Sequence, residues 1–166
     1  MNVRQIFQGK DRFLDLLLLG DEQEDMIARY LGRGELFALY DPNLRGVCVV
    51  TDEGAGTFEL KNLAVPPKYQ RRGYGRALVD FCLARCAGRG HTMLVGTGDS
   101  PGTVGFYQSC GFAVTGRVEG FFTQNYPAPS GTRPKGITSG TWCIWRWAFR
   151  PGPAASFLLR SASLNP

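Results

Sequence analysis

A glycine-containing segment between a predicted strand and a predicted helix constrains this chain most. Residues 57–65 are predicted to form a strand, and Pro66-Pro67 ends that run. The apolar side chains of residues 72–87 recur at helical spacing, which predicts an amphipathic helix, and residues 92–95 form another short apolar run. A strand, a helix and a second strand in this order predict a parallel strand pair within residues 57–95.

The remaining segments predict an α/β fold with a mixed sheet and helices on both faces. Asp41-Pro42-Asn43 has the composition of a turn, so the runs on either side of it are predicted to form a hairpin. Asp21, with Glu24 three residues later, forms an N-terminal capping pattern. The predicted strands are residues 2–7, 36–40, 46–51, 57–65, 92–95 and 112–118, and the predicted helices are residues 11–19, 21–31, 72–87 and 104–110.

Length and composition favour a single domain. The chain has 166 residues, 43% of them hydrophobic, which is enough for one compact core and too short for two domains. We expect residues 1–150 to form this domain and residues 151–166 to be a disordered tail. No apolar run approaches the roughly 20 residues of a membrane span, and residues 1–5 lack the pattern of a secretory signal. We therefore expect a cytoplasmic protein without a membrane partner.

Cysteine and histidine usage argues against metal and hydrolase chemistry. The five cysteines are odd in number, no Cys-x-x-Cys pair occurs, and His91 is the single histidine. This pattern disfavours a disulfide framework, a zinc site and a Ser-His-Asp or Cys-His hydrolase. We therefore expect buried thiols and no metal.

The net charge of +5 raises a nucleic-acid alternative, but the positive excess is local. All 14 acidic residues precede residue 120, whereas five of the 19 basic residues follow residue 129. The first 129 residues are therefore neutral, and we expect no nucleic-acid partner. The alternative predicts salt-sensitive binding that requires residues 130–166.

Residues 70–76 have the properties of a phosphate-binding loop. Two glycines let the backbone approach a ligand closely, and the free N–H groups at a helix start favour an anion. Three arginines add positive charge that suits a pyrophosphate and a ribose phosphate. The spacing matches neither a dinucleotide fingerprint nor a Walker loop, so a helix start without a ligand remains the alternative. The candidate residues are Gln70, Arg71, Arg72, Gly73, Tyr74, Gly75 and Arg76.

Two motifs resemble those of a known family. Residues 63–65, a short proline-containing link and residues 70–78 resemble the acetyl-CoA pyrophosphate motif of the GNAT N-acetyltransferases, Arg/Gln-x-x-Gly-x-Gly/Ala. Residues 106–112 are similar to the second signature of that family, Tyr-x-x-x-Gly-Phe. The resemblance covers about residues 1–126, most securely 57–118. It implies the GNAT acyl-CoA N-acyltransferase fold, with a mixed, mostly antiparallel central sheet.

The resemblance also implies a reaction and a coenzyme site. The reaction is transfer of an acetyl group from acetyl-CoA to a primary amine by direct attack. The backbone of Leu63, Ala64 and Val65 is expected to hold the pantetheine arm, and an N–H there is expected to meet the thioester oxygen. Residues 97–101, which leave the next strand at the same edge, are expected to face the coenzyme or the substrate.

Two side chains are candidates for catalysis by the same resemblance. Tyr107 is expected to protonate the departing thiolate, and the alternative is a core aromatic side chain. Glu59 is expected to take the proton of the amine, directly or through a water. The alternative for Glu59 is a strand-face carboxylate paired with Lys61, and Asn62 could share or replace its role.

The acceptor side is less well specified by the sequence. Phe121, Phe122 and Tyr126 lie on a segment that lines the acceptor cleft in many such folds, so we expect them to contact the substrate; the alternative places them in the core. The amine could belong to a small molecule or to a peptide. Homodimers are common in the resembling family, which leaves a homodimer open here.

The chain departs from the family near residue 130. All three tryptophans lie within residues 142–147, where relatives often read Arg-Asp-Met-Val-Tyr-Leu. Read from the third base of each codon, residues 140–145 can encode Asp, Met, Val, Tyr and Leu in turn. We therefore hypothesise a shifted reading frame, so that the chain is native-like to about residue 129 and atypical beyond it.

Two alternatives remain open for this tail. Residues 141–149 have the aromatic and β-branched content of a strand and can form the protein's own last strand, with Cys143, Trp145, Trp147 and Phe149 on one face. The altered tail also allows a catalytically impaired protein that keeps the GNAT fold and binds CoA as a sensor or scaffold.

Overall fold

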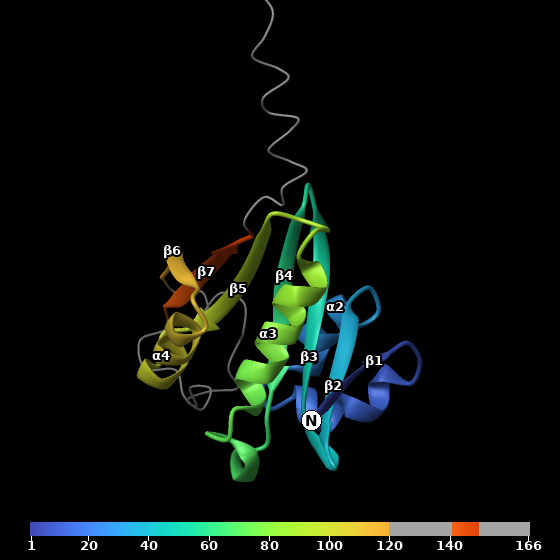
Figure 1. The fold of residues 1–166 in the computed structure, drawn as a ribbon. Coiled ribbons are helices and arrows are strands. Elements are labelled where there is room, and N and C mark those ends of the chain that lie inside the picture. Colours follow the sequence, from blue (N-terminus) through green and yellow to red (C-terminus); the bar gives the residue numbers. More distant parts are fainter. Residues whose placement is uncertain (120–140, 150–166) are drawn as a thin grey trace, which may run out of the picture.

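The structure, a computed structural model that describes residues 1–119 and 141–149, is built on one mixed β-sheet (Figure 1). Its seven strands lie in the order β1-β2-β3-β4-β5-β7-β6. Their bounds are β1 Asn2–Ile6, β2 Glu35–Asp41, β3 Asn43–Gly54, β4 Thr57–Ala64, β5 Thr92–Gly98, β6 Ala113–Val118 and β7 Trp142–Ala148. Strands β4 and β5 are parallel and the other neighbours are antiparallel. The parallel step predicted within residues 57–95 is confirmed.

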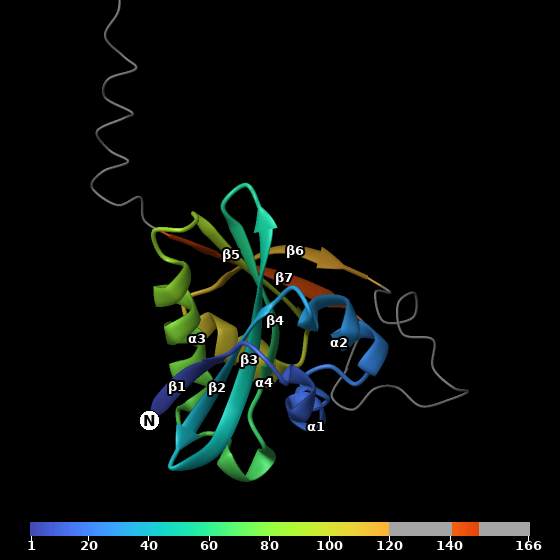
Figure 2. The ribbon, with the colours of Figure 1, turned by 90° about the vertical axis from the view of Figure 1, so that its right-hand side faces the viewer.

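Helices cover both faces of the sheet, as predicted (Figure 2). Helices α3 and α4 pack on one face, called the α3 face below, and the short helices of the N-terminal segment pack on the other, called the α2 face. In β2, Phe37 and Leu39 point to the α3 face whereas Leu36 and Ala38 point to the α2 face, which explains the continuous apolar run of that strand. The helical bounds are η1 Lys10–Phe13, α1 Leu14–Leu17, α2 Glu24–Leu31, η2 Pro67–Tyr69, α3 Tyr74–Cys86 and α4 Pro101–Ser109.

Two helix starts differ from the sequence prediction. Helix α2 begins at Glu24, and its N-cap, Gln23, makes no side-chain capping bond, so the capping pattern assigned to Asp21 is wrong. The Asp21 carboxylate instead accepts a hydrogen bond from the Gln23 amide at 3.4 Å. Helix α4 begins at Pro101, three residues earlier than predicted, because Ser100 accepts a hydrogen bond from the Thr103 amide and proline suits the first helical position.

The atypical tail supplies β7, which lies between β5 and β6. Cys143 and Trp145 are buried on the α3 face, and Trp147 and Phe149 pack against the same cluster. The Trp142 indole lies against Gly96, where any side chain would collide with it. Among the described residues, no helix is long and apolar enough to cross a membrane.

Candidate active site

The sheet opens in its middle, between β4 and β5. These two strands pair only where residues 57–60 face residues 92–95. Beyond that point β4 stays paired with β3 as far as Ala64, and β5 stays paired with β7 as far as Gly98. Within the described chain, the facing edges of residues 61–64 and 96–98 therefore have no strand partner. Their backbone groups are available to a ligand that enters the opening.

A β-bulge in β4 sets which side chains line this opening. Val49 pairs with Asn62 and Val50 with Leu60, so Lys61 is the extra residue. Before the bulge Leu60 points to the α3 face, and after it Leu63 and Val65 do so as well. Sequence reasoning missed the bulge. Its signal was the pair of successive polar residues, Lys61 and Asn62, that shifts the alternation by one position.

The start of α3 offers backbone donors beside the opening. Gly73 is the N-cap with φ of +85°, a left-handed conformation that favours glycine, and no side chain caps the helix. Among the described residues, no amide from Arg71 to Arg76 donates a hydrogen bond to another backbone group. Gly75 allows the start of α3 and the Phe106 ring of α4 to lie close together, because a Cβ on Gly75 would lie 3.3 Å from Cζ of Phe106. These amides and the positive end of the helix dipole favour an anion.

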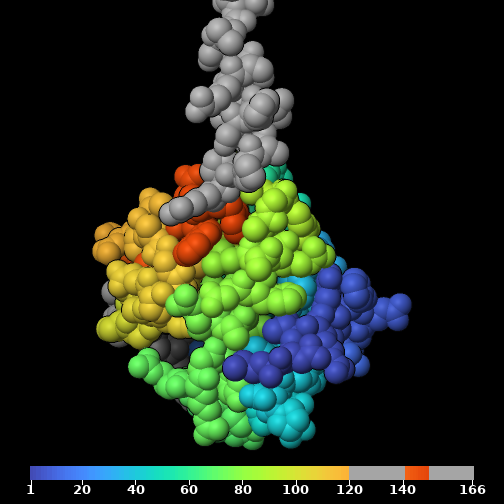
Figure 3. Space-filling view, viewed as in Figure 1, coloured from blue at the N-terminus to red at the C-terminus, as the bar shows by residue number. Residues whose placement is uncertain are grey.

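A cleft of about 890 Å³ lies between this helix start and α4 (Figure 3). It brings together both motifs found in the sequence. Ala64, Arg72 and Tyr74 do not line it, although they were predicted to bind the coenzyme. The predicted residues that line it are Leu63, Val65, Gln70, Arg71, Gly73, Gly75, Arg76 and Tyr107. Of residues 97–101, Ser100 and Pro101 contribute. Sequence reasoning missed Gly102, Thr103 and Gly105, because no motif marked α4 before Phe106; Phe106 and Ser109 lie within the second motif but were not singled out as site residues.

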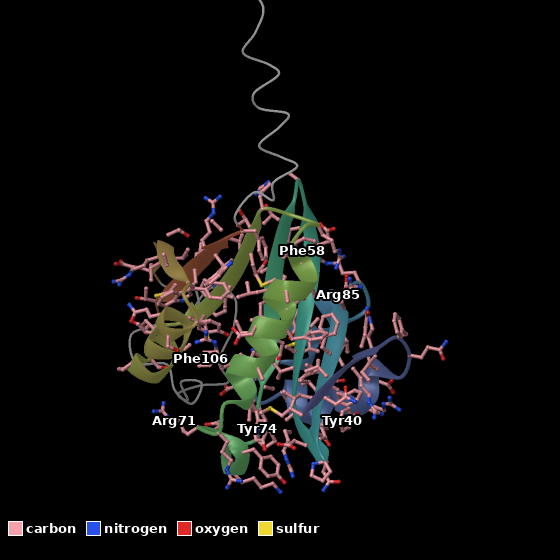
Figure 4. The ribbon with its side chains drawn as sticks, viewed as in Figure 1. Tyr40, Phe58, Arg71, Tyr74, Arg85 and Phe106 are labelled. Carbon is pink, nitrogen blue, oxygen red and sulfur yellow. The ribbon has the colours of Figure 1, made fainter. Side chains whose placement is uncertain are left out.

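Side chains of the predicted phosphate loop have different roles. Gln70 donates to the Val65 carbonyl oxygen at 2.9 Å and so holds the loop against the end of β4. Tyr74 turns away from the cleft and donates to the Asp41 carboxylate at 2.9 Å. Figure 4 shows Arg71 extending from the base of α3 toward the side on which α4 lies. Arg71 forms no ion pair within the described residues, so its charge is available to the cleft.

Tyr107 is the buried aromatic side chain of the cleft. Its ring contacts Phe106, Phe112 and Trp145, with centroid separations of 5.0, 5.8 and 6.2 Å. Burial raises the pKa of the Tyr107 phenol above its usual value, and the neighbouring thiols of Cys110, Cys48 and Cys82 raise it further. No described residue forms a hydrogen bond with its hydroxyl. The phenol thus stays protonated at the cleft, as a proton donor must.

Glu59 lies outside the cleft, on the α2 face. Its carboxylate is 2.5 Å from the Lys61 ammonium, which is also 3.6 Å from Glu53. The pairing that the sequence left as the alternative is therefore present. The Asn62 side-chain amide donates hydrogen bonds to the Leu17 carbonyl oxygen and to the Tyr30 hydroxyl, both at 3.0 Å. It therefore links β4 to the helices of the α2 face. Phe121, Phe122 and Tyr126, the predicted substrate contacts, lie outside the described residues.

A sheet that opens beside an uncapped helix start, with a buried tyrosine in the adjoining cleft, suits an elongated ligand that carries phosphate groups. Comparison with known proteins gives the family. Residues 3–112 match the acetyltransferase (GNAT) family, and the chain belongs to it. It is 34% identical over 122 residues to the uncharacterized N-acetyltransferase YvbK of Bacillus subtilis (strain 168), which covers 72% of this chain and 79% of YvbK.

Solved structures of similar proteins carry the coenzyme. An acetyltransferase of Bacillus subtilis in complex with CoA has a TM-score of 0.80 and 28% identity, over 90% of this chain and 99% of the other. A GNAT family acetyltransferase from Elizabethkingia anophelis with acetyl-CoA bound has a TM-score of 0.77 and 30% identity, over 89% and 97% of the two chains. The protein is therefore an acetyltransferase with the GNAT fold, and acetyl-CoA is its acyl donor.

The cleft residues fit this donor. The open amides at the start of α3 and the Arg71 guanidinium suit phosphate groups. The unpaired strand edges of residues 61–64 and 96–98 suit the amides of a pantetheine arm. Gly102 and Gly105 leave open space on the α4 side, since a Cβ at either would meet nothing within 4 Å. The described residues contain no group of three or more potential metal ligands.

Proposed function

We propose that the protein transfers the acetyl group of acetyl-CoA to a primary amine by direct attack. The coenzyme enters by the cleft on the α3 face, and the amine approaches the opening between β4 and β5 from the α2 face. The opening itself carries this proposal, because it is where the cleft, the free strand edges and Tyr107 adjoin. Bound acetyl-CoA supplies a thioester that an amine can attack.

Backbone groups position the donor in this proposal. The amides that begin α3 bind the pyrophosphate, with Arg71 beside them, and Gln70 holds the loop to β4. The free edge of residues 63–65 holds the pantetheine arm, and an N–H of that edge donates to the thioester carbonyl oxygen. Such a donor stabilises the negative charge that develops on this oxygen during attack.

Tyr107 and Glu59 move protons in this proposal. The Tyr107 hydroxyl gives its proton to the departing thiolate, which its raised pKa permits because the phenol is neutral before the reaction. The Glu59 carboxylate accepts a proton from the ammonium of the acceptor, directly or through a water. To do so, Glu59 must exchange one contact with Lys61 for the acceptor or that water.

The acceptor is an amine on a small molecule or a peptide, and Phe121, Phe122 and Tyr126 remain the predicted contacts with it. Fold neighbours act on different amines: an aminoglycoside 6′-N-acetyltransferase has 18% identity and a ribosomal-protein-S18-alanine N-acetyltransferase of Escherichia coli has 19%. Such distant similarity defines the fold alone. A homodimer also stays a prediction, which light scattering of the purified protein would test.

A binding assay and a turnover assay together test the proposal. Acetyl-CoA and desulfo-CoA should both raise the melting temperature, and thiol release should appear with at least one member of a panel of amines. Tyr107→Phe should lower kcat by about 10²-fold or more and leave the melting shift intact. Stabilisation without thiol release for any amine would contradict catalysis, and absence of stabilisation would contradict the coenzyme site.

Two matched variants isolate the role of Glu59. Glu59→Gln should lower kcat about tenfold or more if this carboxylate is the base. Glu53→Gln is the control, because Glu53 contacts the same Lys61 ammonium from β3. Equal small losses in both variants would show that Glu59 only takes part in the ion-pair network.

A further inference from the structure

The catalytic tyrosine of the proposed mechanism has one aromatic neighbour that does not belong to its own segment. Phe106 precedes Tyr107 in α4, and Phe112 lies between α4 and β6, so both belong to the same stretch of chain as Tyr107. Trp145 comes from β7, in the interior of the sheet, and its ring lies 6.2 Å from the Tyr107 ring at an interplanar angle of 34°. Among its aromatic neighbours, Trp145 is therefore the one that packs Tyr107 against the sheet.

Trp145 is itself held firmly. Its side chain is fully buried, with 0% exposure. In register it faces Val95 of β5 on one side and Val114 of β6 on the other. Its indole Nε1 donates a hydrogen bond to Oγ1 of Thr97 at 3.1 Å. An indole packed and hydrogen-bonded in this way has one orientation, because any rotation would leave a buried N–H without a partner.

Thr97 connects this indole to the opening in the sheet. It lies on the part of β5 that no longer pairs with β4, and its hydroxyl donates to the Gly98 carbonyl oxygen at 3.0 Å. One hydrogen bond therefore ties Trp145 to the strand that borders the opening, while its ring contacts Tyr107. The chain of contacts runs from the edge of the opening to the proton donor.

We infer that Trp145 is a positioning residue that fixes where the Tyr107 hydroxyl lies in the cleft. The inference rests on the proposed role of Tyr107 as the acid and extends it to the tail of the protein. Displacement of a catalytic group by about 1 Å can lower a rate about 10²-fold. A change at Trp145 should therefore reduce kcat more than it reduces coenzyme binding, since Trp145 does not line the cleft.

A double-mutant cycle on kcat tests this inference. Trp145→Phe keeps an aromatic ring but loses the N–H and part of the volume, and we expect kcat to fall about tenfold with the acetyl-CoA KM within about twofold. In a Tyr107→Phe background the same substitution should have no further effect, because the group that it positions is gone. Thr97→Val removes the hydrogen-bond acceptor at similar volume and should reproduce part of the loss if Trp145→Phe fails to fold.

The control is Phe37→Leu, which perturbs the same buried cluster where Phe37 contacts Phe81. It should lower the melting temperature and leave kcat unchanged. An equal loss of kcat from Trp145→Phe with and without the Tyr107 hydroxyl would overturn the inference. A fully active Tyr107→Phe variant would instead refute the acid role in the proposed function, so the two failures are distinguishable.

Discussion

The Arg76 guanidinium donates a hydrogen bond from Nη1 to the carbonyl oxygen of Ser109 at 2.9 Å, and so joins the first turn of α3 to the last residue of α4. Its Nε contacts both carboxylate oxygens of Asp80, each at 2.9 Å. The sequence favoured a phosphate ligand at Arg76. In the structure this side chain is a brace between the two helices that form the walls of the cleft.

Substitution of Asp80 distinguishes a brace from a phosphate ligand. If Arg76 is a brace, Arg76→Ala and Asp80→Ala should both lower kcat/KM for acetyl-CoA by about two- to fivefold, because exposed ion pairs contribute little. If Arg76 is a phosphate ligand, Asp80→Ala should free its guanidinium and leave binding unchanged or tighter. Steady-state kinetics of the two single variants and the double variant separate these outcomes.

Gly73→Ala should weaken both the fold and coenzyme binding. A Cβ at φ of +85° costs about 1–2 kcal/mol of folding free energy, and the strain acts on the amides that begin α3. Gly88→Ala is a matched control, because Gly88 has φ of +83° and open space around it but does not line the cleft. Both variants should lose similar melting temperature, whereas only Gly73→Ala should raise the Kd of acetyl-CoA. Equal Kd values would mean that this helix start does not bind the coenzyme.

The parts of the fold that the sequence predicted depend on local patterns. Strand β4, helix α3 and strand β5 followed from periodicity, and the glycine loop followed from residue types at a helix start. The Arg76 and Asp80 pair was also readable, because residues four apart on a helix are neighbours. The bulge at Lys61 required the pairing of β4 with β3, which only the assembled sheet fixes.

The site depended more on contacts between distant segments. Tyr107 was found from a motif, but its burial against Trp145 requires β7 to insert between β5 and β6. The position of Glu59 on the α2 face follows from the alternation of β4, which the sequence contained. The sequence alone could not show whether the Glu59 carboxylate is paired with Lys61 or free, because Lys61 also contacts Glu53 of the neighbouring strand β3.

The pH dependence of kcat should contain no titration of Tyr107 below about pH 10. Because burial raises the pKa of this phenol, the folded state favours its protonated form. The contribution of this group to the free energy of unfolding is fully present below the pKa of tyrosine in the unfolded chain, about 10. It is lost as the pH rises toward the pKa of Tyr107 in the folded protein. The ratio of kcat for the wild type to kcat for Tyr107→Phe should therefore stay constant from pH 7 to about pH 10. A ratio that collapses around pH 8 would show that Tyr107 itself loses its proton there, which would contradict the raised pKa.

The cysteines should react slowly with thiol reagents while the protein is folded. All five are buried. Burial raises the pKa of the Cys86 thiol to about 12 and raises the pKa of Cys110 as well. Thiolates are the reactive form, so Ellman's reagent at pH 8 should report few reactive thiols in the native protein and all five in guanidinium chloride. Rapid reaction of a native cysteine would contradict the packing around α3.

The frame hypothesis predicts a specific change in the coding DNA. A single inserted or deleted base near codons 127–135 should restore Asp-Met-Val-Tyr-Leu in place of the residues around Trp142–Trp147. The restored segment is a short run of apolar and aromatic residues and can occupy the position of β7 between β5 and β6, as the present sequence does. The restored protein should therefore keep the acetyl-CoA melting shift. Its kcat should change, because the contact that Trp145 now makes with Tyr107 would be replaced. If no single-base change restores that reading, the tail is this protein's own last strand.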